Sequence, residues 1–342
     1  MLYIRTDMND VIASGHVMRC LSVADAAKRG GEDTVFLLAD NQAVPLLEKR
    51  GYQSVILHTQ WNHMDAELPV LKKAVEKHQI QSLLIDSYQV TENYLRELSK
   101  VTGTFYIDDL NAFYYPVNGI ICYANYWEKF GYPQIYKDTK LYLGPQYIPL
   151  RKEFCNCQKK YIDPFVNRLL LMSGGSDPYH ILPQILERIE KETYQRIDVI
   201  CGIYNTDYNG LKEKYQPDKN IFVHKAVDDM AAYMKRADLA VSAGGTALYE
   251  LCAVGTPAIS YAIADNQLNN VRKFEEDGLM DYAGDVRKED AVSNIIRLIC
   301  GIRKNQTLRM ERSQKMQKLV DGKGAERIAE ILKNTEVREQ KV

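Results

Sequence analysis

Short apolar runs alternate with amphipathic segments along most of this chain of 342 residues. In its first third, the apolar runs cover residues 2–6, 34–39, 54–58, 81–86 and 103–108. Segments with helical periodicity separate these runs; in residues 17–29, Cys20, Leu21, Ala24 and Ala27 share one face. Strand–helix repeats of this length predict a parallel sheet with helices on both faces.

The alternation pauses between residues 145 and 164, where prolines, charged residues and a Cys-Asn-Cys segment cluster. Further apolar runs then follow at residues 169–172, 196–201, 221–224, 239–242 and 258–261. Because a chain this long suits two domains, we predict an α/β protein made of two doubly wound, Rossmann-type domains. They cover residues 1–150 and 163–342, with a linker over 151–162, and face each other across a ligand-binding cleft.

Two glycine-rich turns mark the second predicted domain. Ser173-Gly174-Gly175-Ser176 and Ser242-Ala-Gly244-Gly245-Thr246 each follow an apolar run and precede a segment with helical character. At such a turn, the free backbone N–H groups and the dipole of a helix favour a phosphate group. Either turn alone is equally well explained as a plain strand-to-helix connection. Together they predict a bound nucleotide diphosphate.

Charge and cysteine content exclude several classes of protein. Lys and Arg number 44 against 45 Asp and Glu, so no overall basic field favours nucleic acid. No apolar run reaches the roughly 20 residues that span a bilayer, and residues 1–7 lack a signal-peptide layout. The seven cysteines contain no CxxC pair. We therefore expect a cytoplasmic protein without membrane insertion, bound metal or cofactor.

Candidate catalytic residues follow the predicted strands of the first domain. A polar loop runs from Arg5 and Asp7 to Gly15-His16 at a predicted helix start, and Arg19 follows one turn later. A histidine at this place can act as a base at neutral pH, although a capping or solvent-exposed histidine fits the position equally well. The charged residues are open to a purely structural role.

Other candidate residues lie at the ends of later strands. Asp86 and Tyr88 follow the run at 81–86, and Asp108-Asp109 ends the next run, where a helix-capping role is the simplest interpretation. In the second domain, Glu250 lies in the helix opened by the second glycine turn, on an otherwise apolar face. A carboxylate there suits the hydroxyls of a ribose, and Asn266-Gln267 supplies amides to a sugar, a phosphate or a helix cap.

These residues together resemble one family over roughly residues 1–285. The resemblance rests on Arg5-Thr-Asp7 with Gly15-His16-Val-Met-Arg19, on Leu-Gly144-Pro-Gln-Tyr-Ile-Pro-Leu-Arg151, on Ser-Gly174-Gly175-Ser-Asp177, on Ala-Gly244-Gly245-Thr-Ala-Leu-Tyr-Glu250, and on Asp-Asn266-Gln267. The chain resembles the UDP-sugar hydrolases of pseudaminic-acid biosynthesis, which are grouped with spore-coat polysaccharide proteins and, more distantly, with glycosyltransferases of the GT-B architecture. Ala13 and Ser87 depart from the family pattern, which has Gly and His there.

The resemblance implies a GT-B-like fold and a metal-independent hydrolase. Its substrate would be a UDP-linked 2,4-diacetamido-2,4,6-trideoxyhexose, cleaved at the anomeric carbon to give UDP and the free sugar. By motif position, His16 matches the general base and Tyr88 an active-site tyrosine. The residues matching substrate and UDP contacts are Arg5, Asp7, Gly15, Arg19, Asp86, Gly174, Gly175, Ser176, Gly244, Gly245, Thr246, Glu250, Asn266 and Gln267.

Three other functions compete with this prediction, and the sequence disfavours the third. The first is a GT-B glycosyltransferase with a UDP-sugar donor, because the glycine turns and Glu250 indicate a UDP-binding site but do not indicate which reaction follows. The second is a non-catalytic sugar-nucleotide binding protein, against which His16 and Tyr88 argue. The third, an NAD-dependent oxidoreductase, requires a GxGxxG turn after the first strand, where this chain has a single glycine, Gly15. We expect a monomer.

Overall fold

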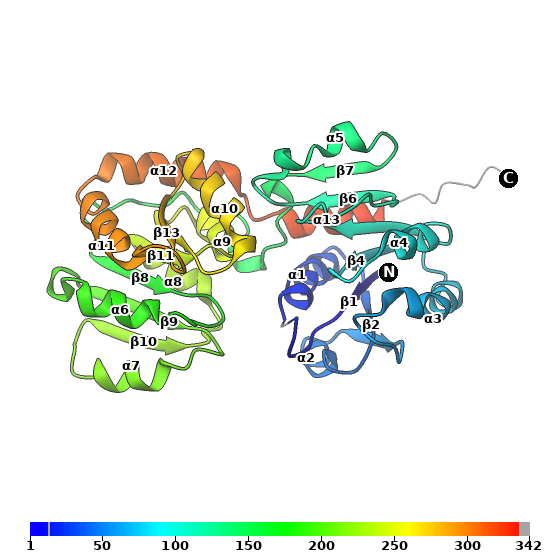
Figure 1. Ribbon diagram of the computed structural model, residues 1–342, viewed down its shortest axis with the longest axis horizontal. Helices are drawn as coiled ribbons and strands as arrows, with labels where there is room; N and C mark the ends of the chain where they lie inside the picture. Colours follow the sequence, from blue (N-terminus) through cyan, green and yellow to red (C-terminus); the bar gives the residue numbers. More distant parts are fainter. Residues whose placement is uncertain (13, 335–342) are drawn as a thin grey trace. The chain divides into compact units, whose positions relative to one another are not determined.

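The computed structural model describes residues 1–12 and 14–334, so Ala13 and residues 335–342 lie outside the described part. The chain forms two compact units (Figure 1). Unit 1 comprises Met1–Lys152 together with the described residues from Gly322 onward. Unit 2 comprises Glu153–Asp321.

Unit 1 is built on a parallel sheet of seven strands in the order β3-β2-β1-β4-β5-β6-β7. The strands are β1 (Leu2–Thr6), β2 (Thr34–Leu38), β3 (Gln53–Ile56), β4 (Ser82–Asp86), β5 (Gly103–Ile107), β6 (Gly119–Cys122) and β7 (Lys140–Leu143). The helices are α1 (Gly15–Arg29), α2 (Val44–Lys49), α3 (Met64–Lys77), α4 (Glu92–Leu98), α5 (Tyr132–Ile135) and α13 (Gly324–Lys333), with short 3₁₀ turns η1 (Trp127–Phe130) and η2 (Pro145–Tyr147).

Helices cover both faces of this sheet, as the apolar pattern predicts. Helices α1 and α13 pack against each other and against β1. Apolar side chains of α3 and α4, among them Leu71 and Leu95, join residues of β1, β4 and β6 in one buried cluster. Strands covered on both faces become continuous apolar runs, and every residue of β4 is buried.

Unit 2 repeats the architecture with six parallel strands in the order β10-β9-β8-β11-β12-β13. The strands are β8 (Arg168–Met172), β9 (Arg196–Cys201), β10 (Ile221–Lys225), β11 (Leu239–Ala243), β12 (Ala258–Ala262) and β13 (Asp281–Asp285). The helices are α6 (Ile181–Arg188), α7 (Tyr208–Lys214), α8 (Met230–Arg236), α9 (Ala247–Val254), α10 (Asp265–Glu276), α11 (Ala291–Ile302) and α12 (Gln306–Leu319), with 3₁₀ turns η3 (Lys152–Phe154) at the unit boundary and η4 (Lys191–Thr193).

The strand order reverses once in each sheet. The reversal falls between β1 and β4 in unit 1 and between β8 and β11 in unit 2. Connections leaving two such neighbouring strands diverge to opposite faces of the sheet, and the crevice at their carboxyl ends is where doubly wound folds bind ligands. The loops that follow these four strands are therefore the parts of the chain in which a site is expected.

The structure confirms the predicted α/β class and the two Rossmann-type halves. It adds β6, β7 and β13, which the sequence pattern did not indicate. The C-terminal boundary also differs from the prediction, because α13 belongs to unit 1 rather than to the domain predicted over 163–342. Ala325, Ile328 and Leu332 of α13 are buried in unit 1, and Ser82 Oγ donates a hydrogen bond to the Leu332 carbonyl at 3.0 Å.

A close approach explains why α13 begins with glycine. A Cβ atom at Gly324 would lie 2.2 Å from the carbonyl oxygen of Ile148, so a side chain at this position would push the helix away from the rest of unit 1.

Among the described helices, none combines the length and the apolar character that a membrane span requires.

Candidate functional site

The candidate catalytic group of unit 1 forms where the sheet order reverses. Asp86 is the last residue of β4 and pairs in register with Thr6, the last residue of β1. The loop after β1 leads into α1, which places His16 in the first helical turn and Arg19 three residues later on the same side. Strand order and helix geometry thus bring His16 and Arg19 to the Asp86 carboxylate.

Asp86 holds the imidazole of His16 from one side. Nδ1 of His16 lies 2.7 Å from Oδ1 of Asp86, and the Asp86 side chain has no exposed surface. The positive charge of Arg19 and the hydrogen bonds from Arg19 and His16 hold the pKa of Asp86 well below its usual range, against the opposing effect of burial. Nη2 of Arg19 lies 3.0 Å from the same Nδ1. Because an ionised carboxylate is only an acceptor and its contact is the shorter one, we place a proton on Nδ1 of His16.

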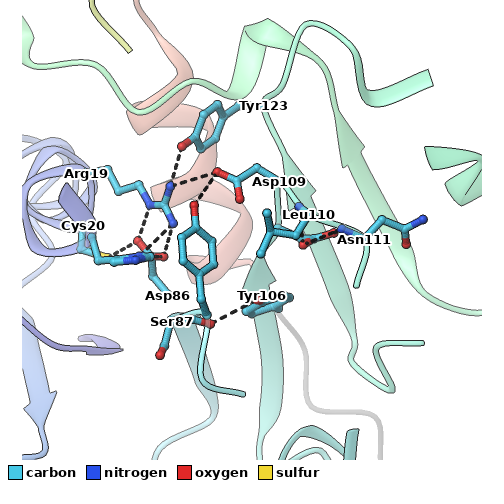
Figure 2. A network of polar contacts seen from close by, with 12 residues as sticks. Arg19, Cys20, Asp86, Ser87, Tyr106, Asp109, Leu110, Asn111 and Tyr123 are labelled. Atoms are coloured by element: carbon cyan, nitrogen blue, oxygen red, sulfur yellow. Dashed lines mark hydrogen bonds and ion pairs between the residues drawn. The ribbon is translucent and has the colours of Figure 1, made fainter. Parts of the chain in front are cut away.

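Arg19 clamps the same carboxylate and extends the network (Figure 2). Its Nε donates to Oδ2 of Asp86 at 2.5 Å, and its Nη2 donates to Oδ1. On the other side of the guanidinium, Nη1 lies 2.6 Å from the Tyr123 hydroxyl and 3.5 Å from Oδ2 of Asp109. The Arg19 side chain is 13% exposed, and its guanidinium is fixed from both sides by carboxylates.

Tyr88 completes the group. Its hydroxyl donates to Oδ2 of Asp109 at 3.0 Å, and its ring meets the His16 ring edge to face at a centroid distance of 4.7 Å. Burial and the Asp109 carboxylate raise the pKa of Tyr88, so its hydroxyl stays protonated at neutral pH. Oδ1 of Asp109 is buried and has no hydrogen-bond partner among the described residues.

This arrangement leaves one imidazole nitrogen available. With the Nδ1 proton held by Asp86, neutral His16 carries its lone pair on Nε2, which has no partner within the described chain. A carboxylate that fixes the tautomer and stabilises the imidazolium is the arrangement in which histidine works as a general base. The group can therefore remove a proton from an O–H group that reaches Nε2.

In unit 2, two helix N-termini near the strand reversal differ in whether they are capped. At α6, the backbone N–H groups of Ile181 and Leu182 donate to the Asp177 carboxylate at 3.0 and 2.9 Å. At α9, the cap residue Thr246 is exposed and its side chain makes no capping bond. The N–H groups of Thr246 and Ala247 donate to none of the described residues. The α9 terminus thus presents free donors at the carboxyl end of β11.

The glycines before α9 have different roles. A Cβ atom at Gly244 would lie 2.4 Å from Cγ1 of Val271, and the Gly244 carbonyl accepts a hydrogen bond from Nδ2 of Asn270 at 2.9 Å. Gly244 thus lets α10 pack closely on the turn. Gly245 borders open space, so a ligand can approach the backbone there.

Residues 169–331 match the model of the glycosyltransferase family 28 C-terminal domain. Among solved structures, MurG of Acinetobacter baumannii superposes with a TM-score of 0.70 at 12% identity, over 97% of this chain and 99% of that chain. The spinosyn rhamnosyltransferase SpnG gives a TM-score of 0.62 at 11% identity, over 98% and 100%. The fold is GT-B-like.

Curated relatives are distant. The spore coat polysaccharide biosynthesis protein SpsG of Bacillus subtilis is 21% identical over 94% of both chains. An uncharacterised protein of Methanocaldococcus jannaschii is 25% identical over 74% of this chain. The pseudaminic acid cytidylyltransferase and UDP-2,4-diacetamido-2,4,6-trideoxy-beta-L-altropyranose hydrolase of Helicobacter pylori is 23% identical over 78% of this chain. The aligned regions span about half of the last two proteins, 54% and 45%.

The structure brings most predicted residues of unit 1 together but places two of them elsewhere. Arg5 is fully buried and is held by Glu67, through contacts of 2.8 and 2.7 Å, and by Asp7 at 2.5 Å. Oδ1 of Asp7 accepts the N–H group of Ala39 at 2.8 Å. Since these partners use the charged atoms of both residues inside the protein, we assign Arg5 and Asp7 to the structure of unit 1 rather than to ligand binding. Gly15 is exposed at the start of α1.

The first glycine turn of unit 2 also departs from expectation. It does not open directly into a helix, because α6 begins at Ile181 and its N-terminal donors are taken by Asp177. Gly174, with φ +83°, and Gly175 are exposed, and Ser176 is partly exposed. The Gly175 carbonyl accepts from Tyr204 N at 3.0 Å. The backbone of this turn is accessible to a ligand, but no free helix N-terminus adds its N–H donors there.

Glu250 and the Asn266-Gln267 pair occupy different surroundings. Glu250 is partly exposed on the side of α9 that carries Thr246 and Ala247, not on the buried face of this helix. The amide oxygen of Gln267 accepts the Ile263 N–H group at 3.0 Å, so this side chain secures the loop before α10. Asn266 is exposed in the first turn of α10.

Two members of the unit 1 network were not assigned to the site from the sequence. Tyr123 follows β6, a strand that the pattern does not reveal, and the sequence favours a helix-capping role for Asp109. The capping interpretation suits its neighbour Asp108, whose carboxylate accepts hydrogen bonds from the N–H groups of Leu110 and Asn111.

The described residues contain no group of three or more His, Cys, Asp or Glu side chains arranged to hold a metal ion.

Proposed function

We propose that this protein transfers the glycosyl group of a UDP-sugar to an O–H acceptor, with His16 as the general base. The observation that carries the proposal is the His16–Asp86 pair at the strand reversal of a GT-B-like fold, with Nε2 left free to accept a proton. The family match over residues 169–331 supports a nucleotide sugar as the donor.

The proposed role of unit 2 is to hold the nucleotide. The free N–H groups of Thr246 and Ala247 and the dipole of α9 suit the diphosphate. Glu250, on the same side of α9, is proposed to bind the ribose hydroxyls, and Asn266 to contact the sugar or phosphate. The exposed backbone of Gly174, Gly175 and Ser176 gives a further phosphate contact.

The proposed reaction moves one proton and exchanges one bond. Nε2 of His16 takes the proton of the acceptor O–H as the oxygen forms a bond to the anomeric carbon. The bond from that carbon to the diphosphate oxygen breaks, its electron pair stays on the oxygen, and UDP leaves. Asp86 stabilises the imidazolium formed, while backbone donors at α9 stabilise the negative charge that develops on the diphosphate.

A hydroxyl acceptor and water are the two candidates for the O–H group. The family model and the glycosyltransferase-like fold favour a hydroxyl acceptor and thus a glycosyltransferase, as does the name of the Bacillus relative, which places that protein in polysaccharide biosynthesis. The name of the Helicobacter relative, which includes a UDP-sugar hydrolase, favours water and a UDP-linked 2,4-diacetamido-2,4,6-trideoxyhexose. The same His16 base serves both reactions.

Release of UDP, with and without acceptor, separates the two candidates. The purified protein is incubated in EDTA with a panel of UDP-sugars that includes 2,4-diacetamido-2,4,6-trideoxyhexoses, and UDP and sugar products are followed by NMR. UDP and free reducing sugar without an acceptor identify a hydrolase, whereas turnover that requires an added saccharide or lipid hydroxyl identifies a glycosyltransferase. If no UDP-sugar binds or turns over, the proposal fails. His16→Gln is the inactive control.

A further inference from the structure

A cavity of unit 2 lies at the opposite end of its sheet from the glycine turns. It has a volume of about 680 Å³, within the range of small-molecule sites. Its wall includes Arg168 at the start of β8, Asp238 directly before β11 and Val254 at the end of α9. These positions mark the amino edge of the sheet, whereas Thr246 lies beyond the carboxyl end of β11. The cavity is therefore separate from the proposed nucleotide site.

Positive charge dominates the wall of this cavity. The cationic side chains are Lys159, Lys160, Arg168, Lys235 and Arg236. Two carboxylates, Asp163 and Asp238, oppose them. Oδ2 of Asp238 already accepts the N–H groups of Asn167 and Arg168 at 2.9 and 2.8 Å, so part of its charge is used on the backbone.

The cations have few anionic partners. Of the five, Arg236 alone forms an ion pair with a described residue, Asp198, and it shares that carboxylate with Arg196 and His224. Nζ of Lys235 donates to the carbonyl of Glu153 at 3.1 Å, which is a neutral acceptor. The cavity thus gathers more positive charge than the protein itself balances.

Lys160 shows the imbalance most clearly. This side chain is partly buried, and the acceptor of its ammonium group is the carbonyl of Lys235 at 2.6 Å. Burial, with Arg168 nearby and only partial compensation from Asp238, lowers the pKa of Lys160 to about 8. Holding an ammonium group away from water without a carboxylate is unfavourable, and an incoming anion would relieve that cost.

The segment that carries Lys160 is anchored rather than loose. The backbone N–H of Lys160 donates to Oε1 of Gln317 in α12 at 3.3 Å, and Nε2 of Gln317 donates to the carbonyl of Gln158 at 2.9 Å. The cavity wall is therefore formed before any ligand arrives, which reduces the entropic cost of binding.

We propose that this cavity binds a small molecule that carries a phosphate or diphosphate group. Three lysines and two arginines around one space suit an anion with more than one charge, because each ammonium or guanidinium can form a charge-assisted hydrogen bond with a phosphate oxygen. The site is independent of the nucleotide proposed for α9.

Chemical protection of Lys160 tests the proposal on the full chain. The protein is acetylated at pH 8 with a neutral amine-reactive ester, with and without inorganic pyrophosphate, and the labelling rate of each lysine is measured by mass spectrometry. Pyrophosphate is expected to slow the labelling of Lys160 several-fold, because the bound anion shields the amine and stabilises its protonated form. Lys219, exposed in the same unit and outside the cavity, should label at an unchanged rate.

Calorimetry of pyrophosphate binding provides the second measurement, with excess UDP present to occupy any nucleotide site. Lys160→Gln and Arg168→Gln should each weaken pyrophosphate binding by roughly tenfold or more, while Lys219→Gln removes the same charge without effect. Arg168 is exposed, so its variant is expected to fold even if Lys160→Gln does not. Equal labelling of Lys160 with and without pyrophosphate, or equal affinity in the cavity and control variants, would overturn the proposal.

Discussion

Asp86 contacts His16 through Nδ1, at 2.7 Å, and this contact decides which nitrogen of the imidazole can accept a proton. The carboxylate is fully buried and accepts two hydrogen bonds from Arg19, so its position is fixed. A neutral His16 therefore presents Nε2 as its basic atom. The pair joins the end of one strand to the start of a helix across the point where the sheet order reverses.

Replacing His16 should separate chemistry from nucleotide binding. His16→Gln keeps a polar side chain of similar reach but removes the basic nitrogen, so we expect turnover of the UDP-sugar to fall by about 10²–10⁴-fold. The affinity for UDP should stay within about twofold, since the proposed UDP contacts lie in unit 2. Steady-state kinetics and calorimetry with UDP measure the two quantities.

His63→Gln is the matched control for this substitution. His63 is exposed at the start of α3, and no side-chain bond of it is found among the described residues. Its variant should match the wild type in both measurements. Full turnover in His16→Gln would show that another group activates the acceptor.

Asp86 should make the protein sensitive to acid. Its pKa is lowered in the folded state, so its contribution to stability is fully present above the ordinary aspartate pKa of about 3.9 and is lost as the pH falls below that value. Asp86→Asn should cost about 3 kcal/mol at neutral pH, because Arg19 loses its main partner. That difference should shrink toward acid pH. Urea denaturation of both proteins over a pH series measures it.

Asp138→Asn serves as the control for the acid experiment. Asp138 is exposed and has no ion pair among the described residues. Its variant should follow the wild-type stability at every pH. A difference between Asp86→Asn and wild type that does not change with pH would mean that Asp86 acts through packing rather than charge.

Arg5 and Glu67 should behave as a structural pair. Arg5→Met leaves the fully buried Glu67 without its guanidinium, and we expect a loss of about 3–5 kcal/mol in the free energy of unfolding. The double variant Arg5→Met/Glu67→Met should be less destabilised than the sum of the single variants, because neither charge is left alone. UDP affinity should not change. A large loss of UDP affinity in a folded Arg5→Met protein would instead place Arg5 in the binding site.

Most of the strands that the sequence predicted correctly, though not the edge strands β3 and β10, are covered on both faces. Leu83, Leu84 and Ile85 of β4 therefore appear as an unbroken apolar run. Strand β13 has the sequence Asp-Tyr-Ala-Gly-Asp and becomes a strand through pairing with β12, a long-range effect that no local pattern shows. Strand β6 is only four residues long and follows a tyrosine-rich segment that obscured it.

The same difference between local sequence patterns and long-range contacts decides which site residues the sequence could predict. His16 and Asp86 were predictable because each lies directly beside a recognisable strand or helix start. Their pairing across 70 residues depends on the strand order. Tyr123 reaches Arg19 across 104 residues and follows the unpredicted β6, so nothing in the sequence pointed to it. The sequence places Arg5 among the site residues because it is charged near a strand end, whereas its pairing with Glu67, 62 residues away, favours a structural role.

The free N-terminus of α9 predicts that stability and nucleotide binding can be changed in opposite directions. Thr246→Asp places a carboxylate at the cap position, where it can accept the N–H group of Leu248 or Tyr249 and stabilise the helix by about 1 kcal/mol. The same charge repels a diphosphate, so UDP affinity should fall at least roughly tenfold. Thr246→Asn is the matched control, because it caps the helix with the same shape and no charge. We expect a raised Tm in both variants but a strong loss of UDP affinity in Thr246→Asp alone. Equal UDP affinity in the two variants would show that the diphosphate does not bind at this helix terminus.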